Sequence, residues 1–172
     1  MKRVFWFGSL VFVGCGTVSQ AFSDPNATIS ILTLEMPDAY PEIPGIVERF
    51  NNLMKHHPDY VEGAVRSIEV VESLKERDEK VGVNTVGLCI AKKWENGPVQ
   101  RGSGRIYLKK DFWDHAMSID KEAVLIHEFS HCQLGLSHTE GKPSIMNPTI
   151  PLMEYLKEHW GELITDLLNQ RS

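Results

Sequence analysis

One segment limits the possible folds of this chain more than any other: the run His127-Glu128-Phe129-Ser130-His131, which follows four apolar residues. On a helix, two histidines four residues apart lie one turn apart on the same face, so both imidazoles can reach one metal ion. Glu128 is offset from that face, and its carboxylate can hold a water molecule beside the metal. Imidazole ligands and chemistry without redox steps favour zinc. The segment therefore predicts a helix that supplies two ligands to a zinc ion.

The simplest alternative is a pair of histidines on a helix surface. The apolar neighbours Ala123–Ile126 argue against it, because they predict burial, and buried imidazoles without partners would cost stability. A catalytic zinc ion takes three protein ligands and keeps a fourth position open. Gly135 lets the chain leave the helix, and the next two residues bring His138 back toward its face. Further on, the run from Ser144 to Pro148 can form a tight turn below the metal.

This order of residues resembles the metzincin clan of zinc endopeptidases, and most nearly the matrixins. The motif of that clan is H-E-x-x-H-x-x-G-x-x-H followed by a methionine turn. The matching positions here are His127, Glu128, His131, Gly135, His138 and Met146, and the resemblance covers about residues 105–150. It implies an α+β fold of the zincin type, with a small twisted mixed sheet of three to five strands, an active-site helix and a C-terminal helix.

The resemblance also implies a reaction, in which zinc-activated water hydrolyses a peptide bond and Glu128 is the general base. It places the wall of a substrate pocket around Asn147 to Leu152, and it implies that an edge strand within Val83–Ala91 pairs with an extended substrate. A peptide or protein is the expected substrate of a monomeric enzyme. Two alternatives keep the metal: an amide hydrolase acting on cell-envelope material, and a zinc-bearing binding domain without turnover. Glu128 argues against the latter, because a structural zinc site closes its fourth position with another ligand.

Two departures from the clan pattern affect the third ligand. The stretch Cys132-Gln133-Leu134 contains one residue more than the motif allows before Gly135, so the helix end must bulge or wind further to deliver His138. This leaves room for a rival ligand from a downstream helix, Glu154 or Glu158. The second departure is that no tyrosine stands two places after Met146, which removes the tyrosine ligand of the astacin and serralysin type.

The N-terminus predicts export. A short cationic start, Met1-Lys2-Arg3, precedes the apolar run Val4–Val13, as in a secretory signal, and the run is about half the length of a spanning helix. Cleavage after the small-x-small site Ser19-Gln20-Ala21 would release a soluble domain, residues 22–172. Val13-Gly14-Cys15 instead resembles a bacterial lipobox, which would leave a lipid on Cys15 and make it the only membrane link. Both alternatives place the protein outside the cytoplasm of a bacterium, secreted, in the periplasm or on the outer membrane.

Export changes the interpretation of the remaining thiols, because disulfides persist outside the cytoplasm. A Cys89–Cys132 disulfide is expected, and two buried free thiols are the alternative. Cys132 directly follows His131, so on a helix it points about 100° away from the metal. The chain of 172 residues carries a net charge of -5, which excludes a nucleic-acid binder that works by overall charge.

Periodicity and turn residues predict the remaining elements. Strands are expected at 65–71, 81–91 and 105–108, a helical turn near 112–117, and helices at 42–56, from Ser118 or Asp120 to near 135, and from 151 to about 169. His115 and His159 have no partner at metal-ligand spacing and are expected to be ordinary packed or surface residues. His56 and His57 flank the end of the first helix, where a positive charge interacts favourably with the helix dipole.

Overall fold

Three strands form one mixed sheet in this computed structural model, which describes residues 33–95 and 97–171. They are β1 (Val65–Val71), β2 (Gly87–Ile90) and β3 (Gly104–Lys109), in the spatial order β1-β3-β2. The central strand β3 is parallel to β1 and antiparallel to β2, which leaves β2 at an edge. The predicted export signal and Cys15 lie outside the described residues.

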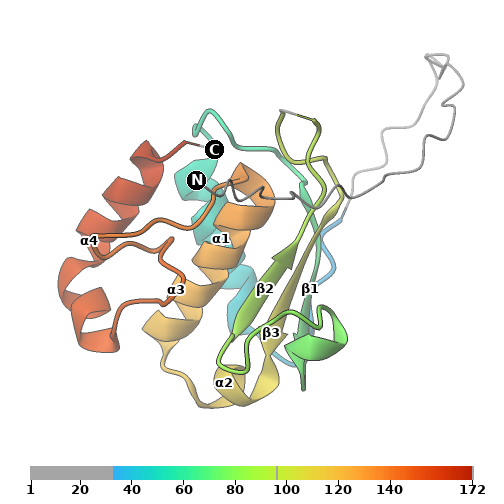
Figure 1. Cartoon of the computed structure of the whole chain (residues 1–172), viewed down its shortest axis with the longest axis vertical. Helices are drawn as coiled ribbons and strands as arrows, with labels where there is room; N and C mark the ends of the chain where they lie inside the picture. The colour runs from blue at the N-terminus through green and yellow to red at the C-terminus, as the bar shows by residue number, and fades with distance from the viewer. Residues whose placement is uncertain (1–32, 96, 172) are drawn as a thin grey trace, which may run out of the picture. The chain divides into compact units, whose positions relative to one another are not determined.

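Four α-helices and two short helical turns complete the described part of the chain. The helices are α1 (Glu42–Met54), α2 (Lys110–His115), α3 (Ser118–Phe129) and α4 (Met153–Asn169), and the turns are η1 (Leu74–Glu76) and η2 (Ser130–Leu134). Figure 1 shows α1 and α3 beside the sheet. Helix α4 lies farther from the sheet, and α3 lies between α4 and the sheet. The architecture is α+β, as predicted, with three strands at the lower end of the expected range. None of the described helices is both long and apolar enough to cross a membrane.

Helix α3 runs through the centre of the hydrophobic core. Its second half, from Ala123 to Phe129, is buried on all sides, because the sheet, α1 and α4 each pack against it. The aromatic rings of Phe129 and Phe50 lie 5.0 Å apart and join α3 to α1. At the surface, the Arg49 guanidinium donates two hydrogen bonds, of 2.8 and 3.0 Å, to Glu122. The histidine-bearing helix is therefore held by packing rather than by its own propensity.

The strand predicted over 81–91 is too long, because regular pairing begins only at Gly87. Residues 82–85 form a turn, closed by the Thr85 N–H donating to the carbonyl of Gly82. The valines in this stretch suggested a strand, but Val83 has no core to face and remains 69% exposed. Turn chemistry has overridden β-propensity here.

One smaller expectation at a helix end is also wrong. Neither Ser118 nor Asp120 caps α3 with its side chain, since the residue at the cap position is Met117 and no side-chain bond is made there. His57, which follows the end of α1, is buried. Its Nδ1 accepts a hydrogen bond from the Asp59 N–H, and its Nε2 lies 3.0 Å from the Gln170 carbonyl. His57 therefore links the end of α1 to the C-terminal segment.

Candidate metal centre

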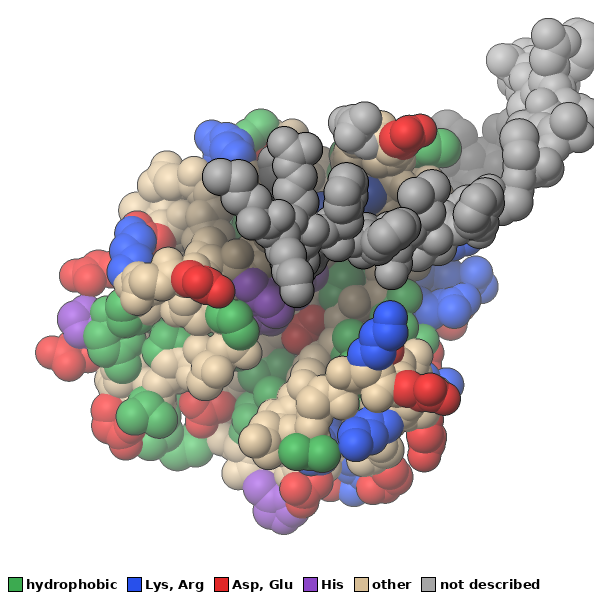
Figure 2. All heavy atoms as spheres, viewed as in Figure 1, with side chains coloured by type: hydrophobic (Ala, Val, Ile, Leu, Met, Phe, Trp, Pro, Cys, Tyr) green, Lys and Arg blue, Asp and Glu red, His purple; other side chains and the backbone are tan. Residues whose placement is uncertain are grey.

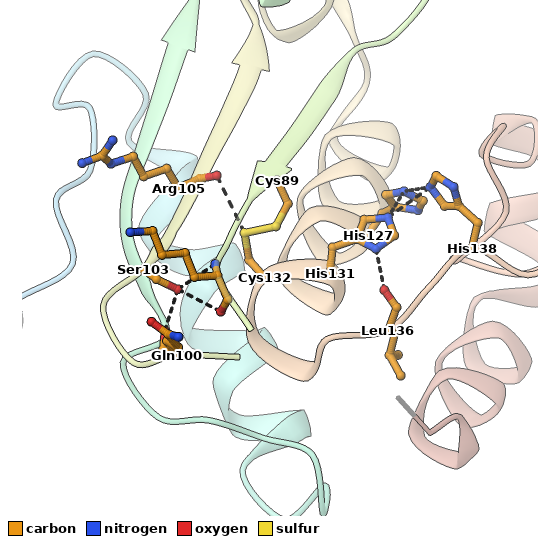
Figure 3. The surroundings of a disulfide bond; sticks show 10 residues. Cys89, Gln100, Ser103, Arg105, His127, His131, Cys132, Leu136 and His138 are labelled. Carbon is orange, nitrogen blue, oxygen red and sulfur yellow. Dashed lines mark hydrogen bonds between the residues drawn. A yellow bond between two sulfur atoms is a disulfide. The ribbon is translucent and has the colours of Figure 1, made fainter. Parts of the chain in front are cut away.

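Three imidazoles converge where α3 ends (Figure 3). His127 comes from α3, His131 from η2, and His138 from the loop that follows. The Nε2 atom of His131 lies 3.0 Å from that of His127 and 3.1 Å from that of His138, and the third separation is 3.2 Å. The structure thus brings together all three histidines that the sequence singled out. In the space-filling view, histidine and acidic side chains lie in a hollow near the middle of the face (Figure 2).

Backbone carbonyls orient two of these rings. The Nδ1 of His127 lies 2.6 Å from the Ile145 carbonyl oxygen, and the Nδ1 of His131 lies 2.7 Å from that of Leu136. Because a carbonyl only accepts, each Nδ1 must carry the proton, which leaves the Nε2 lone pair of each neutral ring facing the other. Carbonyl partners of this kind fix the orientation of metal-ligating histidines in general.

The donor set fits a zinc ion. Lone pairs that face one another at about 3 Å repel unless a cation lies between them, and nitrogens around a tetrahedral zinc ion stand about 3.3 Å apart. Burial lowers the pKa of His127 to about 4 and also lowers the pKa of His131. Both rings are therefore neutral at pH 7, and no proton has to leave them before a metal binds.

The extra residue before Gly135 is accommodated by a π-helical turn. Residues Ser130–Leu134 follow α3 directly in this wider winding, and the N–H groups of Gly135 and Leu136 both bond to the Ser130 carbonyl. Gly135 has a φ of +71°, a left-handed conformation that ends the helix. The Lys93 ammonium donates a 2.5 Å hydrogen bond to the Gly135 carbonyl. The predicted bulge is confirmed, and it directs the following loop so that His138 meets the other two rings.

Glu128 is buried beside the edge strand β2, with 6% of its surface exposed. Burial raises the pKa of its carboxyl group to about 8, although a hydrogen bond from the Cys89 backbone N–H opposes the shift. The metal-free protein therefore holds a carboxyl group whose proton affinity is close to that needed for proton transfer near neutral pH.

The predicted disulfide between Cys89 and Cys132 is present and joins β2 to η2 (Figure 3). Its sulfur atoms lie on the side of η2 away from the three imidazoles, as the helical position of Cys132 required. The bond spans a sequence separation of 43 residues, and closing a loop of this length stabilises a fold by about 4 kcal/mol in the chain-entropy estimate. It fastens the edge strand directly beside the His131 position.

The segment around Met146 forms the turn that the sequence predicted. The Met146 N–H donates to the Ser144 hydroxyl oxygen, and the Asn147 N–H donates to the Ser144 carbonyl. Met146 is fully buried, and its carbonyl accepts a hydrogen bond from the Thr139 N–H. The same turn supplies the Ile145 carbonyl to His127, so it supports the metal centre through its backbone.

Other candidates stand outside this group of three. Glu154 and Glu158 are exposed on α4. His115 is exposed beside Asp111, and His159 stacks on Tyr155 with ring centroids 4.2 Å apart.

Among the described residues, no strand pairs with the outer edge of β2, which is called its free edge below. The Lys109 N–H of β3 donates to the Val86 carbonyl, and in an antiparallel ladder only alternate residues bond to the partner strand. The peptide groups of Gly87 and Cys89 therefore face away from β3. Of these, the Cys89 N–H is bonded to Glu128.

Comparison with known families agrees with this geometry. The family model described as Matrixin, a peptidase family, matches residues 59–162 of the chain. The chain belongs to the matrixin family. As a matrixin it is a zinc-dependent metallopeptidase in general type, with peptides or proteins as its class of substrate. No curated protein and no solved structure matches the chain.

Several groups at the centre of this matrixin could not be identified from the sequence. The carbonyls of Ile145 and Leu136 carry no sequence signal, because every residue has one. Lys93 follows the strand expected at 81–91, and nothing in the sequence linked it to Gly135 forty-two positions later. Gly87 did offer a signal, since a glycine inside a strand often marks a close approach by another group.

Proposed function

We propose that this matrixin is an endopeptidase in which His127, His131 and His138 hold zinc and Glu128 is the general base. The observation that carries the proposal is the convergence of three Nε2 atoms within 3.2 Å of one another, next in sequence to a buried carboxyl group. A zinc ion in this position would activate water as a nucleophile and polarise the carbonyl of the scissile bond.

The chain's own residues have distinct tasks in this proposal. The imidazoles position the metal, and the Ile145 and Leu136 carbonyls hold the first two rings in place. The Glu128 carboxylate accepts a proton from the attacking water and passes it to the departing amine. The Cys89 N–H keeps this carboxylate at the wall of the site while the proton moves.

The free edge of β2 is the proposed binding site for an extended substrate backbone. Its outward groups other than the Cys89 N–H, which interacts with Glu128, would add the substrate as a further strand. Such pairing gives affinity without dependence on side chains. The stretch from Asn147 to Leu152 is proposed to line the pocket for the residue after the cleaved bond. Leu152 is 79% exposed, so its apolar side chain is accessible to a substrate.

The experiment incubates the zinc-loaded protein with a mixed peptide library and identifies new termini by mass spectrometry. Internal cleavage that stops with a chelator and returns with added zinc is the expected result. Parallel incubation with envelope material tests amide bonds of other kinds. A protein that binds one zinc ion and cleaves no peptide in the library would contradict the endopeptidase proposal.

Export is a further part of the proposal. The disulfide supports it, because such bonds are rare in cytosolic proteins and persist outside the cytoplasm. The intact mass of the protein recovered from its host separates the routes: a chain beginning at Phe22 indicates a soluble product, and a lipid-modified chain beginning at Cys15 indicates an anchored one. A recovered chain that retains its first residue would contradict both.

A further inference from the structure

The side chain of Glu128 occupies a notch in strand β2 that exists because residue 87 is glycine. A Cβ atom on Gly87 would lie 2.5 Å from Oε1, 2.8 Å from Cγ and 3.0 Å from Cδ of Glu128. These distances are much shorter than the van der Waals contact distance between two heavy atoms. No residue with a side chain therefore fits at position 87 while Glu128 keeps its place.

Strand β2 cannot easily move away to relieve such a clash. Two residues after Gly87, the disulfide joins Cys89 to Cys132, and past the end of the strand Lys93 bonds to the Gly135 carbonyl. Both attachments reach the part of the chain that directly follows His131. On its other side, the strand pairs with β3 from Gly87 to Ile90. Because the strand is fastened, a side chain at position 87 would displace the carboxyl group of Glu128.

The same strand also presents a backbone donor to Glu128. The Cys89 N–H faces away from β3, and its interaction with the carboxyl group lowers the pKa of Glu128 against the effect of burial. Steric contact at Gly87 and the bond from Cys89 therefore act on one side chain from adjacent outward-facing positions. Packing and a single donor together leave Glu128 little freedom of rotation.

We propose that Gly87 is a positioning residue, which with the Cys89 N–H fixes the Glu128 carboxylate for proton transfer. The proposal rests on the catalytic role proposed for Glu128. It differs from a role in stability alone, which would lower the free energy of unfolding and leave kcat unchanged. The three atoms nearest to a Cβ on Gly87 all belong to Glu128, and none belongs to a metal-binding histidine.

The test is Gly87→Ala in the full chain, with Gly82→Ala as the matched control. Gly82 precedes the same strand, and a Cβ there would lie 3.5 Å from its nearest neighbour, the Thr85 hydroxyl oxygen, which is ordinary contact. For Gly87→Ala we expect kcat to fall by about 10²–10⁴, the range for a general acid–base group, with KM and zinc content unchanged. For Gly82→Ala all three should stay at the wild-type values.

A second readout is independent of activity. In the metal-free protein, hydrogen exchange of the Cys89 amide should become about tenfold faster in Gly87→Ala, because its acceptor has moved. Wild-type exchange together with wild-type kcat would overturn the proposal. If wild-type protein cleaves nothing, the proposed function fails, and the exchange rate alone then decides whether Gly87 positions Glu128.

A variant that does not fold is also informative. In that case Gly87→Ala is combined with Glu128→Ala, which removes all three atoms that the new Cβ would meet. Recovery of folding in the double variant assigns the clash to Glu128 and supports the proposal. A double variant that still fails to fold places the conflict elsewhere and overturns it.

Discussion

Glu128→Gln should yield a folded, zinc-loaded protein whose kcat for peptide cleavage is lower by about 10²–10⁴. Glutamine has the shape of glutamate, and its amide oxygen can accept the hydrogen bond from the Cys89 N–H. It fits the notch at Gly87 equally well, so the backbone has no reason to move. What it lacks is the ability to take a proton. Steady-state kinetics, together with zinc analysis of the same sample, checks the result.

The same variant has an expected signature in stability against pH. The pKa of Glu128 in the metal-free folded protein, about 8, lies above the ordinary value of 4.5, so folding favours the protonated form. As pH rises from 4.5 through 8, the unfolded chain ionises first and the folded protein loses stability. Glu128→Gln removes this loss. Urea unfolding with chelator should show that the stability of the variant relative to the wild type rises from pH 5 to pH 8, because the contributions of His127 and His131 are common to both proteins.

Full residual activity in Glu128→Gln would reject the general-base role. Loss of zinc together with activity would be a different failure, because it would make Glu128 part of the metal site. The matched control is Glu122→Gln on the same helix, whose carboxylate pairs with Arg49 instead of facing β2. This control should keep the wild-type kcat.

His138→Ala should lose zinc, and this is the second large effect. It leaves two imidazoles, and we expect the zinc affinity to fall by more than the 10–100-fold typical of losing a group that only supports a ligand. A 100-fold loss corresponds to about 2.7 kcal/mol of zinc-dependent stability. Competition with a chelator of known affinity measures the first quantity, and thermal unfolding with and without zinc measures the second.

Glu154→Ala is the control for the third ligand, because Glu154 was the rival from the downstream helix. It is exposed on α4, and its removal should leave zinc content unchanged. Stoichiometric zinc in His138→Ala, combined with zinc loss in Glu154→Ala, would move the third ligand to α4.

The sequence carried the positions of the candidate ligands because their spacing reflects helical geometry. His127 and His131 need only one turn of helix, and Gly135 marks the point where the chain must leave it. The start of β2 could not be predicted in the same way. Val81, Val83 and Val86 have the composition of a strand, and only tertiary context shows that Gly82 and Thr85 form a turn instead. Similarly, the spacing indicated a bulge before Gly135, but its form as a π-helical turn depends on the Ser130 carbonyl accepting from two residues.

The orientation of His127 and His131 depends on main-chain oxygens, and this has an evolutionary consequence. Substitutions at Ile145 or Leu136 change the side chain but leave the carbonyl, so an apolar exchange that preserves packing keeps the ring direction. Most point mutations at these two positions therefore leave the carbonyl groups that orient the ligands in place. Insertions and deletions move them, as does a substitution that changes the backbone at Gly135, and the π-helical turn accommodates one residue more than the clan motif. We therefore expect family members to differ around the metal centre more in the lengths of the loops than in the identities of the residues at these two positions.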